Sequence, residues 1–369
     1  MKVQHRSTYA LIHLGHLRHN LSVVKSLSPK AKTVGVVKAN AYGHGATPIA
    51  KALIEAGCEN LGVATIEEGI ALREAGIEKP ILVFDGMLTG HPEVFLEHQL
   101  TPVLHCENDF EILKTITKPL KVHLKFDTGM GRLGFFPNEL PKVLELVSQN
   151  SFLEVEGVMS HLARADEKDP TPTKRQYGFF KKIRGEFETS GLNPIFHLAN
   201  SAALLDGLAQ TETGWVRPGI MLYGGLPHTR LLASSLKPVM TLITRLLVVR
   251  DCPKGTALSY GATYVTSKHS RIGVLPIGYA DGYPRLLSNK GAVVIHGKKA
   301  PIVGRICMDL TLVDVTTIPE AKGADEVLLF GEKNGTHLPV EEVAKWAQTI
   351  SYEILCGITT RVPRIYEET

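Results

Sequence analysis

Short runs of apolar residues alternate with helical patterns through the first two-thirds of the chain. The runs are rich in β-branched and aliphatic residues, as buried strands are, and their starts lie about 20 or more residues apart. We expect eight strands, at residues 33–37, 60–64, 80–84, 101–105, 121–126, 154–159, 195–199 and 215–217. Each interval is long enough for a crossover helix, as parallel strands require. An α/β fold with an N-terminal (β/α)8 TIM-like barrel fits eight such units better than an open sheet.

Two of the intervening helices carry sequence signals at their ends. Thr47 followed by Pro48 indicates an N-cap and a first helical residue, and Gly57 marks the end of that helix. Thr65 with Glu68 three positions later has the pattern of a capping box, before a helix that ends at residue 76. These signals support helices between the first three strands.

The pattern changes after residue 234, where strand-like runs follow one another without helical segments between them. We expect strands at residues 241–249, 271–278, 292–297, 300–307, 310–315 and 326–330. Residues 296–299 (HGKK) are typical of a hairpin turn, and residues 340–350 form one amphipathic helical pattern. The sequence therefore predicts two domains, a barrel at residues 1–234 and a C-terminal, mainly β-strand domain at residues 235–369.

Composition is that of an ordinary globular protein. Of the 369 residues 44% are hydrophobic and 21% are charged, which excludes a mainly disordered chain. The 41 Lys and Arg exceed the 37 Asp and Glu by too little for a dedicated nucleic-acid-binding protein. No apolar run reaches the ~18 residues of a membrane span. We therefore expect neither a nucleic-acid nor a membrane partner.

The cysteines and the N-terminal segment indicate the cellular compartment of the protein. The 5 cysteines lie far apart without a CxxC pair, which favours reduced thiols. His and Arg interrupt the apolar residues of the first twenty positions, so no signal-peptide pattern is present. We expect a cytoplasmic protein. The 15 histidines contain no HExxH or comparable spacing, so we expect no metal.

Polar residues follow several of the predicted barrel strands. In a β/α barrel the catalytic groups come from the carboxyl ends of the strands, so we expect these side chains to meet at one mouth of the barrel. A solvated loop would explain any one of them alone, but the set favours an active site. Its members are Lys38, Asp127 with Arg132 close behind, His161, Asn200, Ser201 and Arg217.

Lys38 directly follows a strand in the sequence VVKANAYGHG. A lysine that faces a barrel mouth is partly desolvated, which favours its neutral amine and a Schiff base with a carbonyl group. Ser201, after the seventh strand, and the backbone amides of Gly219 and Ile220, after the eighth, stand where barrels commonly bind phosphate. A Schiff-base lysine together with a phosphate site indicates pyridoxal 5′-phosphate (PLP).

Seven segments, in order and spread over both predicted domains, resemble bacterial alanine racemase. They are VVKANAYGHG (36–45), DTGMGRLG (127–134), HLANSAA (197–203), RPGIMLYG (217–224), SYGATY (259–264), IGYADG (277–282) and GRICMD (304–309). The resemblance implies a PLP-dependent isomerase that racemises alanine by a two-base mechanism, supplying D-alanine for peptidoglycan or serving alanine catabolism. It also implies a homodimer with shared active sites.

The resemblance implies four catalytic residues. Lys38 would bind PLP and act as the base on one face of the substrate Cα. Tyr260 of the partner subunit would act on the other face, because a single base on one face cannot invert the carbon. His161 would activate this tyrosine. Arg217 would face the pyridine nitrogen, which stays unprotonated because a guanidinium gives up no proton.

Further residues match positions around the cofactor. His197 and Asn200 would surround and support Arg217. The cofactor phosphate would contact Tyr42, Ser201, Gly219, Ile220 and Tyr352.

Other matching positions surround the substrate. Arg132 would meet the cofactor's phenolic oxygen and the substrate carboxylate, a bidentate task suited to arginine. Met308 would add a backbone donor to that carboxylate, and Tyr279 would lie on the entrance side. Lys125 matches a lysine that is often carbamylated in the family, which turns a cation into an anion.

Three other functions stay open at this point. Racemases for serine or other small amino acids share this architecture. Gly129, Gly131 and Gly134 form a GxGxxG after a strand, with Glu154 further on, as in nicotinamide-dependent oxidoreductases. A non-catalytic PLP-binding protein would consist of the barrel alone, without the domain that carries Tyr260.

Overall fold

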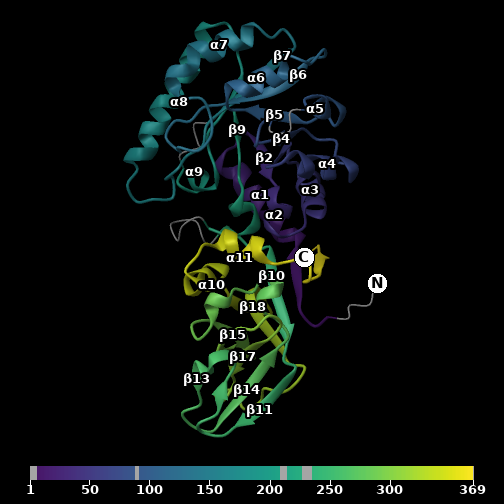
Figure 1. The fold of residues 1–369 in the computed structure, drawn as a ribbon, viewed down its shortest axis with the longest axis vertical. Helices are drawn as coiled ribbons and strands as arrows, with labels where there is room; N and C mark the ends of the chain where they lie inside the picture. The colour runs from purple at the N-terminus through teal and green to yellow at the C-terminus, as the bar shows by residue number, and fades with distance from the viewer. Residues whose placement is uncertain (1–5, 88–90, 208–213, 227–234, 369) are drawn as a thin grey trace.

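Two domains are stacked along the long axis of the molecule, with the barrel above and the β domain below (Figure 1). The computed structural model describes residues 6–87, 91–207, 214–226 and 235–368. Helices α10 (Val340–Ala347) and α11 (Ser351–Gly357) lie at the junction of the domains. Residue 234, where the sequence predicts the domain boundary, lies outside the described residues.

Eight parallel strands form the sheet of the upper domain, in the order β8-β7-β6-β5-β4-β3-β2-β9. Their bounds are β2 (Lys32–Val36), β3 (Asn60–Val63), β4 (Ile81–Val83), β5 (Thr101–Leu104), β6 (Leu120–Lys125), β7 (Leu153–Met159), β8 (Ile195–His197) and β9 (Trp215–Val216). The sheet closes because β2 pairs with β9 and the Arg217 amide donates to the Ala199 carbonyl at 2.9 Å. The predicted barrel is confirmed, and each of its strands overlaps a predicted run.

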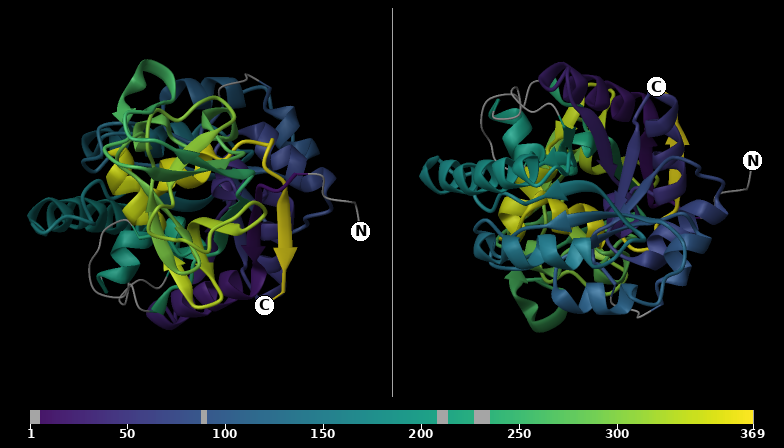
Figure 2. Two further views of the ribbon diagram at one scale, coloured as in Figure 1. Left: turned by 90° about the horizontal axis from the view of Figure 1, so that it is seen from below. Right: turned by 90° about the horizontal axis from the view of Figure 1, so that it is seen from above.

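Helices surround these strands, as the view from above in Figure 2 shows. They are α1 (Leu14–Leu27), α3 (Ala46–Glu55), α4 (Ile66–Glu74), α5 (Glu93–Glu97), α6 (Glu107–Leu113), α7 (Leu140–Ser148), α8 (Thr171–Thr189) and α9 (Ser201–Leu205). α1 precedes the first barrel strand and packs against α3 and α9, so it completes the outer ring. None of the described helices combines the length and the apolar character needed to cross a membrane.

The predicted helix ends are correct in one case and displaced in the other. In α4 the Thr65 side chain and the Glu68 backbone and side chain form the predicted capping box. The predicted N-cap of α3 at Thr47 is wrong by two positions, because Gly45 precedes the helix with a φ of +102° that only glycine adopts readily. The glycines that follow these two helices, Gly57 and Gly76, have positive φ as expected of helix-ending residues.

The lower domain contains two main sheets, in the orders β16-β15-β18-β10-β1-β20 and β11-β14-β17. Their strands are β1 (Tyr9–His13), β10 (Met240–Arg245), β11 (Val248–Cys252), β14 (Ser270–Leu275), β15 (Ala292–Ile295), β16 (Lys298–Pro301), β17 (Thr311–Asp314), β18 (Glu326–Lys333) and β20 (Arg364–Glu367). Three shorter strands are β12 (Ala257–Leu258), β13 (Tyr264–Val265) and β19 (Thr336–Leu338). The predicted mainly β-strand class of this domain is confirmed.

The first strand of the chain belongs to the sheet of the lower domain. β1 pairs antiparallel with β10 and parallel with β20, so both ends of the chain meet in this sheet. The predicted division at residue 234 groups residues 9–13 with the barrel, whereas their hydrogen bonds are made in the β domain. Their apolar pattern predicts burial but carries no information about which sheet they join.

The run predicted as a single strand at residues 241–249 forms two strands in different sheets. Leu246 is buried and its amide bonds to the Asp325 carbonyl, whereas Leu247 is 53% exposed and its amide bonds to the Val274 carbonyl. The chain changes sheets between these two leucines. Hydrophobic pattern could not reveal the break, because both residues continue the apolar run.

The predicted hairpin is confirmed, with a tighter turn than expected. His296 and Gly297 both have positive φ, as a two-residue type I′ turn requires, and β15 pairs with β16 on either side. The predicted strand at residues 300–307 is too long, because β16 ends at Pro301 and residues 302–307 run outside named strands.

Candidate active site

A pocket of about 740 Å³ lies at the carboxyl ends of the barrel strands. Its residues come mostly from the last positions of the strands and the loops that follow them, and Tyr352 of α11 adds a side chain from beyond the barrel. Most of the predicted site residues line it: Lys38, Tyr42, Lys125, Arg132, His161, Asn200, Ser201, Arg217, Gly219, Ile220 and Tyr352.

Lys38 is followed by an uncommon backbone turn. Residues 39–42 all have φ between 51° and 54°, the left-handed region, which costs non-glycine residues about 1–2 kcal/mol each. The Ala39 amide donates to the Glu68 carboxylate at 2.6 Å, which ties the turn to the start of α4. The turn brings the Tyr42 side chain back into the pocket beside half-buried Lys38. Strain at this place is typical of functional sites.

Cationic side chains outnumber the acidic ones, Asp85 and Asp166, around the pocket. Lys38, Lys125, Arg132 and Arg217 all line it. Burial, with the charges of Arg132 and Arg217, lowers the pKa of Lys125 to about 8. Burial, with the charges of the same two arginines, lowers the pKa of His161 to about 3, so this ring is neutral at physiological pH. Such a pocket favours a ligand with anionic groups, such as a phosphate or a carboxylate.

Arg217 is buried and is held by a set of fixed acceptors. Its Nη1 donates to the His197 Nδ1 at 3.0 Å and to the His197 carbonyl at 2.7 Å. Its Nη2 donates to the Ser160 carbonyl at 2.6 Å. His197 is fully buried and is not among the residues that line the pocket, as a supporting role requires. Asn200 lines the pocket and pairs with Arg217 through a backbone bridge.

Hydroxyl groups and backbone amides meet at one side of the pocket. The Ser201 Oγ accepts a hydrogen bond from the Gly219 amide at 2.9 Å. A Cβ at Gly219 would lie only 2.4 Å from the Tyr42 hydroxyl oxygen, so this position requires glycine. The Tyr42 ring lies beside the Tyr352 ring, with their centroids 6.0 Å apart. The Gly219 amide orients the Ser201 hydroxyl group, which can still donate its hydrogen, and with the Tyr42 and Tyr352 hydroxyl groups it suits a phosphate group.

The glycine-rich segment at residues 127–134 is a loop organised by Asp127. The Asp127 carboxylate accepts hydrogen bonds from the amides of Gly129 at 2.8 Å and of Arg132 at 2.9 Å. These amides therefore point at a carboxylate of the same chain. No helix begins within this described segment, whereas a dinucleotide fingerprint needs a helix N-terminus there. The nicotinamide-binding interpretation is therefore wrong.

We expect Asp127→Asn to lower the free energy of unfolding by about 1.5–3 kcal/mol, the usual net value of hydrogen bonds to a charged group. In asparagine an NH₂ replaces one of the two carboxylate oxygens, so it would face at least one backbone N–H group that now donates to Asp127. Burial raises the pKa of Asp127, but the hydrogen bonds from backbone amides more than offset this, so its net pKa lies below the ordinary value.

The stabilisation from the Asp127 charge is therefore complete at neutral pH and is lost as the pH falls through this lowered pKa. Urea unfolding of both proteins between about pH 7 and pH 3 measures the difference, which should shrink in acid. A difference that stays constant over this range would contradict the assignment.

Three predicted site residues lie apart from this pocket, on the β domain. Tyr260 and Met308 line a separate depression of about 390 Å³, and the Tyr279 amide donates to the neighbouring Cys307 carbonyl at 3.1 Å. Tyr260 is 70% exposed, Met308 53% and Tyr279 43%. In one copy of the chain, the two predicted bases Lys38 and Tyr260 therefore belong to different surfaces.

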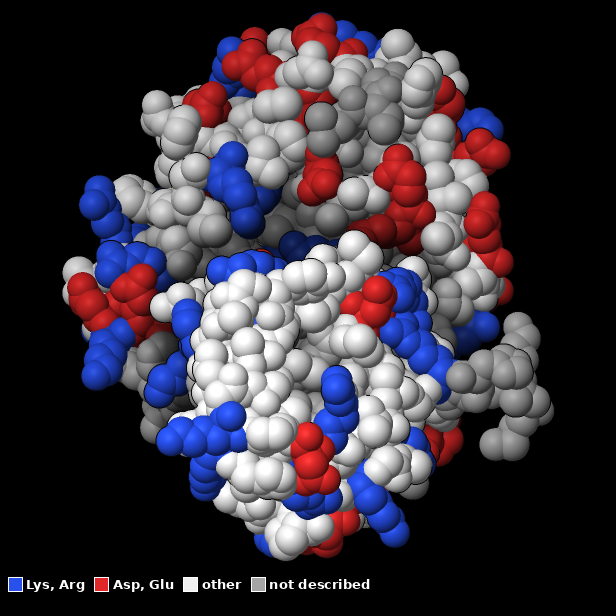
Figure 3. Space-filling model, turned by 60° about the horizontal axis from the view of Figure 1, so that its bottom comes forward, with Lys and Arg blue, Asp and Glu red and all other residues white. Residues whose placement is uncertain are grey.

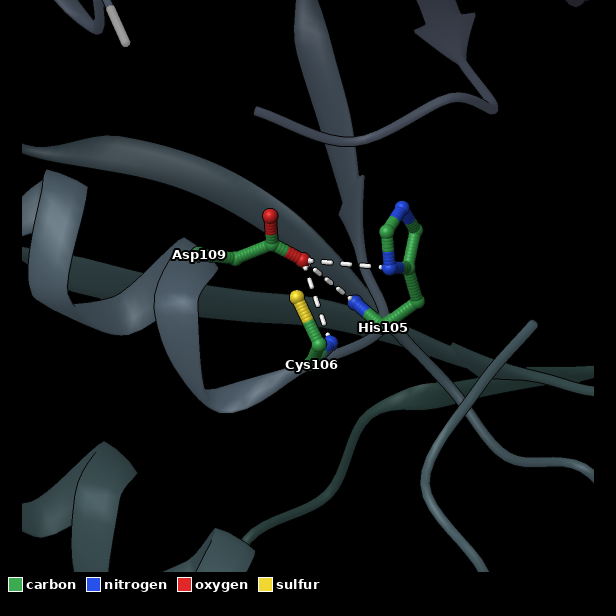
Figure 4. Close-up of side chains that lie close together, drawn as sticks. All are labelled: His105, Cys106 and Asp109. Atoms are coloured by element: carbon green, nitrogen blue, oxygen red, sulfur yellow. Dashed lines mark hydrogen bonds and ion pairs between the residues drawn. The ribbon is translucent and has the colours of Figure 1, made fainter. Parts of the chain in front are cut away.

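One described group of side chains has the composition of a metal site: His105, Cys106 and Asp109, after β5 (Figure 4). The Asp109 carboxylate accepts hydrogen bonds from the amides of His105 at 2.7 Å and of Cys106 at 3.2 Å. Cys106 directly precedes α6, so this carboxylate caps the helix. Capping explains why the three side chains lie together, and the absence of a bound metal stays a prediction.

Sequence reasoning missed several residues of the pocket. Asp85 comes shortly after β4 and could have been found by the same strand-end rule that singled out Lys38. Asp166 lies in the long loop after β7, and Cys356 lies on α11. No pattern in the sequence marks either of these two positions.

Two family models match the chain one after the other. The alanine racemase N-terminal domain matches residues 12–227, and the alanine racemase C-terminal domain matches residues 239–366. The alanine racemase of Halothermothrix orenii is 45% identical to this chain over 374 residues, which cover 98% of this chain and 97% of that protein.

Solved structures match at the same length. The crystal structure of alanine racemase from D-cycloserine-producing Streptomyces lavendulae gives a TM-score of 0.93 at 34% identity, covering 99% of this chain and 98% of that one. The Bartonella henselae alanine racemase with covalently bound pyridoxal phosphate gives a TM-score of 0.90 at 32% identity, covering 98% and 99%. The chain therefore belongs to the alanine racemase family, a family of isomerases.

Proposed function

We propose that this protein interconverts L- and D-alanine with PLP as its cofactor, in a homodimer whose subunits share active sites. The separation of the two candidate bases on one chain is the main support for this proposal. Lys38 lies in the cationic barrel pocket, whereas Tyr260 is largely exposed on the β domain. An exposed tyrosine of one subunit can complete the pocket of another.

The residues of the pocket fit PLP. Lys38 supplies a primary amine for covalent attachment, and the hydroxyl and amide groups around Gly219 suit the phosphate. Arg217, fixed by His197, would face the ring nitrogen and leave it unprotonated, because its guanidinium does not release a proton. Bound PLP withdraws electrons from the substrate Cα and so makes the Cα proton acidic.

Two bases on opposite faces of the substrate Cα would carry the racemisation. Lys38 would remove or return a proton on one face, and the partner subunit's Tyr260 would do the same on the other. His161, a neutral ring in the pocket, would donate its N–H to the phenolate oxygen of that tyrosine and so stabilise the charged form that acts as a base.

The substrate carboxylate would be held by residues of both subunits. Arg132, whose loop is fixed by Asp127, offers paired N–H donors for this anion. The partner's Met308 would add a backbone N–H, and the partner's Tyr279 would narrow the entrance. These contacts orient the Cα–H bond toward one base or the other.

We include carbamylation of Lys125 in the proposal. The lowered pKa of about 8 leaves part of this amine neutral at physiological pH, and a neutral amine adds to CO₂ to give a carbamate with release of a proton. The resulting anion would offset part of the positive charge of the pocket and orient Arg132, which lines the same pocket. Native mass spectrometry would detect the added mass, which acid would remove.

The β domain has an exposed surface that suits a second subunit. Most of the exposed large apolar side chains among the described residues lie between residues 247 and 310. In the view of Figure 3 residues other than Lys, Arg, Asp and Glu make up most of the face of this domain, with charged side chains set among them. Depletion of charge and enrichment of aromatic residues and Met are typical of homodimer interfaces.

A serine racemase is the remaining alternative for the substrate. Initial rates with alanine and serine at equal concentration decide between the two, and we expect alanine to be preferred. We propose that the enzyme supplies D-alanine for peptidoglycan or serves alanine catabolism.

All 5 cysteines are free thiols, which supports the proposed cytoplasmic location.

Borohydride reduction tests the cofactor assignment. The purified protein should show the visible absorbance of a Schiff base, and reduction should fix the cofactor irreversibly on one peptide. We expect that peptide to contain Lys38, and we expect no adduct in a Lys38→Ala control. A label on another lysine, including Lys125, would contradict the assignment.

A further inference from the structure

A chain of hydrogen bonds runs from Arg217 through the barrel interior toward the amino ends of β6 and β7. The Arg217 Nη1 lies 3.0 Å from the His197 Nδ1, and the His197 Nε2 lies 2.7 Å from the His123 Nδ1. The His123 Nε2 lies 3.3 Å from a carboxylate oxygen of Glu156. Both histidines are fully buried, whereas Glu156 is partly exposed and forms an ion pair with exposed Lys121 at 3.0 Å.

The barrel interior provides a specific place for this chain. The His123 side chain faces Gly157 on β7, where a Cβ would lie 2.3 Å from the His123 Nδ1. Only glycine leaves room for the ring at this position. The register of β6 against β7 shifts at the same point, between Val122 and His123. The His123 ring also packs on the Trp215 ring, with their centroids 5.2 Å apart.

The acceptor-only carboxylate and the donor-only guanidinium, at the two ends of the chain, set the direction of every bond. A carboxylate only accepts, so the His123 Nε2 carries the hydrogen that meets Glu156, and the His123 Nδ1 is an acceptor. The His197 Nε2 then donates to that acceptor. The His197 Nδ1 is left to accept from Arg217, which can only donate.

The protonation states agree with this direction. Burial lowers the pKa of both His123 and His197, so both rings are neutral and each has one donor and one acceptor. The hydrogen bond from His123 lowers the pKa of Glu156 to about 2, so its carboxyl group is ionised.

We propose that Glu156 and His123 are positioning residues for Arg217. The carboxylate accepts from His123, His123 accepts from His197, and His197 accepts from the guanidinium, which is thereby held where it would face the cofactor's ring nitrogen. Only the last step rests on the proposed function.

An amide in place of the Glu156 carboxylate can offer the His123 Nε2 either its oxygen or its NH₂, so this end of the chain would no longer enforce one direction. When the NH₂ donates, the His197 ring presents an N–H to the N–H groups of Arg217. Two donors facing each other would lose the bond that holds the guanidinium.

Nitrogen-15 NMR of the histidine rings tests the tautomers in the full-length protein, with PLP bound and after its removal. The signals of His123 and His197 are assigned from variants that lack each ring. In the native protein we expect both rings to carry their hydrogen on Nε2. In Glu156→Gln we expect a measurable population with the hydrogen on Nδ1 of both rings, in exchange with the native form that Arg217 still favours. Unchanged tautomers in this variant would overturn the proposal.

Lys121→Met is the matched control, because it removes the exposed ion-pair partner and keeps the carboxylate. We expect native tautomers in this variant. Reversed tautomers in Lys121→Met would overturn the proposal, because the carboxylate would then not be what sets the direction.

Kinetics and absorbance test the effect on Arg217. We expect Glu156→Gln to lower kcat/KM for alanine about 10-fold, as loss of residues that orient a ligand from behind commonly does, and to shift the absorbance maximum of bound PLP. Lys121→Met should retain native values of both. Native kinetics and absorbance in Glu156→Gln, despite reversed tautomers, would overturn the positioning role. A native protein with no racemase activity would instead contradict the proposed function, and the NMR result would stand independently.

Discussion

Replacing Lys38 with Ala should lower kcat/KM for alanine racemisation by about 1000-fold or more, in both directions. The lysine would supply both the covalent attachment of PLP and one of the two bases, so no other side chain of the pocket takes over either task. Polarimetry measures the rate from each enantiomer, and absorbance spectroscopy should find the Schiff-base band missing.

Lys51→Ala, on the exposed side of α3, is the matched control for loss of a lysine charge and should keep native activity. A Lys38→Ala enzyme within about tenfold of the native rate would contradict the assignment of the base.

Replacing Tyr260 with Phe should lower the rate by about 100-fold to 10000-fold, the usual contribution of a positioned acid or base. The loss should be unequal for the two enantiomers when exchange of the Cα proton with solvent deuterium is measured. The lysine of the other face still exchanges the proton of one enantiomer, whereas the proton on the tyrosine face has no base.

Tyr264→Phe, in the neighbouring strand β13, is the matched control and should leave exchange from both enantiomers unchanged. Equal small losses for both enantiomers in Tyr260→Phe would contradict the two-base assignment.

The barrel could be predicted from the sequence because its strands are short, apolar and separated by capped helices. The same regularity located the pocket, since the residue after each strand faces the mouth of a barrel. Lys38, His161 and Arg217 were found in this way, and all three line the pocket. The position of a strand end follows from the local sequence, so these residues could be found without knowledge of tertiary contacts.

Features that depend on tertiary contacts could not be predicted. The pairing of β1 with β10 joins residues far apart in sequence, and the break between Leu246 and Leu247 depends on a neighbouring sheet. The left-handed turn at residues 39–42 is held by Glu68 from another helix. In the sequence, His123 and Glu156 each belong to an ordinary strand pattern. Their contact can be recognised only when the register of β6 against β7 is known.

A mixture of the two inactive variants tests whether the active site is shared between subunits. Lys38→Ala and Tyr260→Phe subunits are combined in equal amounts under conditions that allow exchange, and alanine racemisation is measured before and after mixing. If one subunit supplies the lysine and its partner the tyrosine, half of the dimers are mixed and each contains one intact site.

We expect activity to rise from near zero to about a quarter of the native value. Activity that stays at the level of the separate variants, although mass spectrometry finds mixed dimers, would contradict an active site shared between subunits.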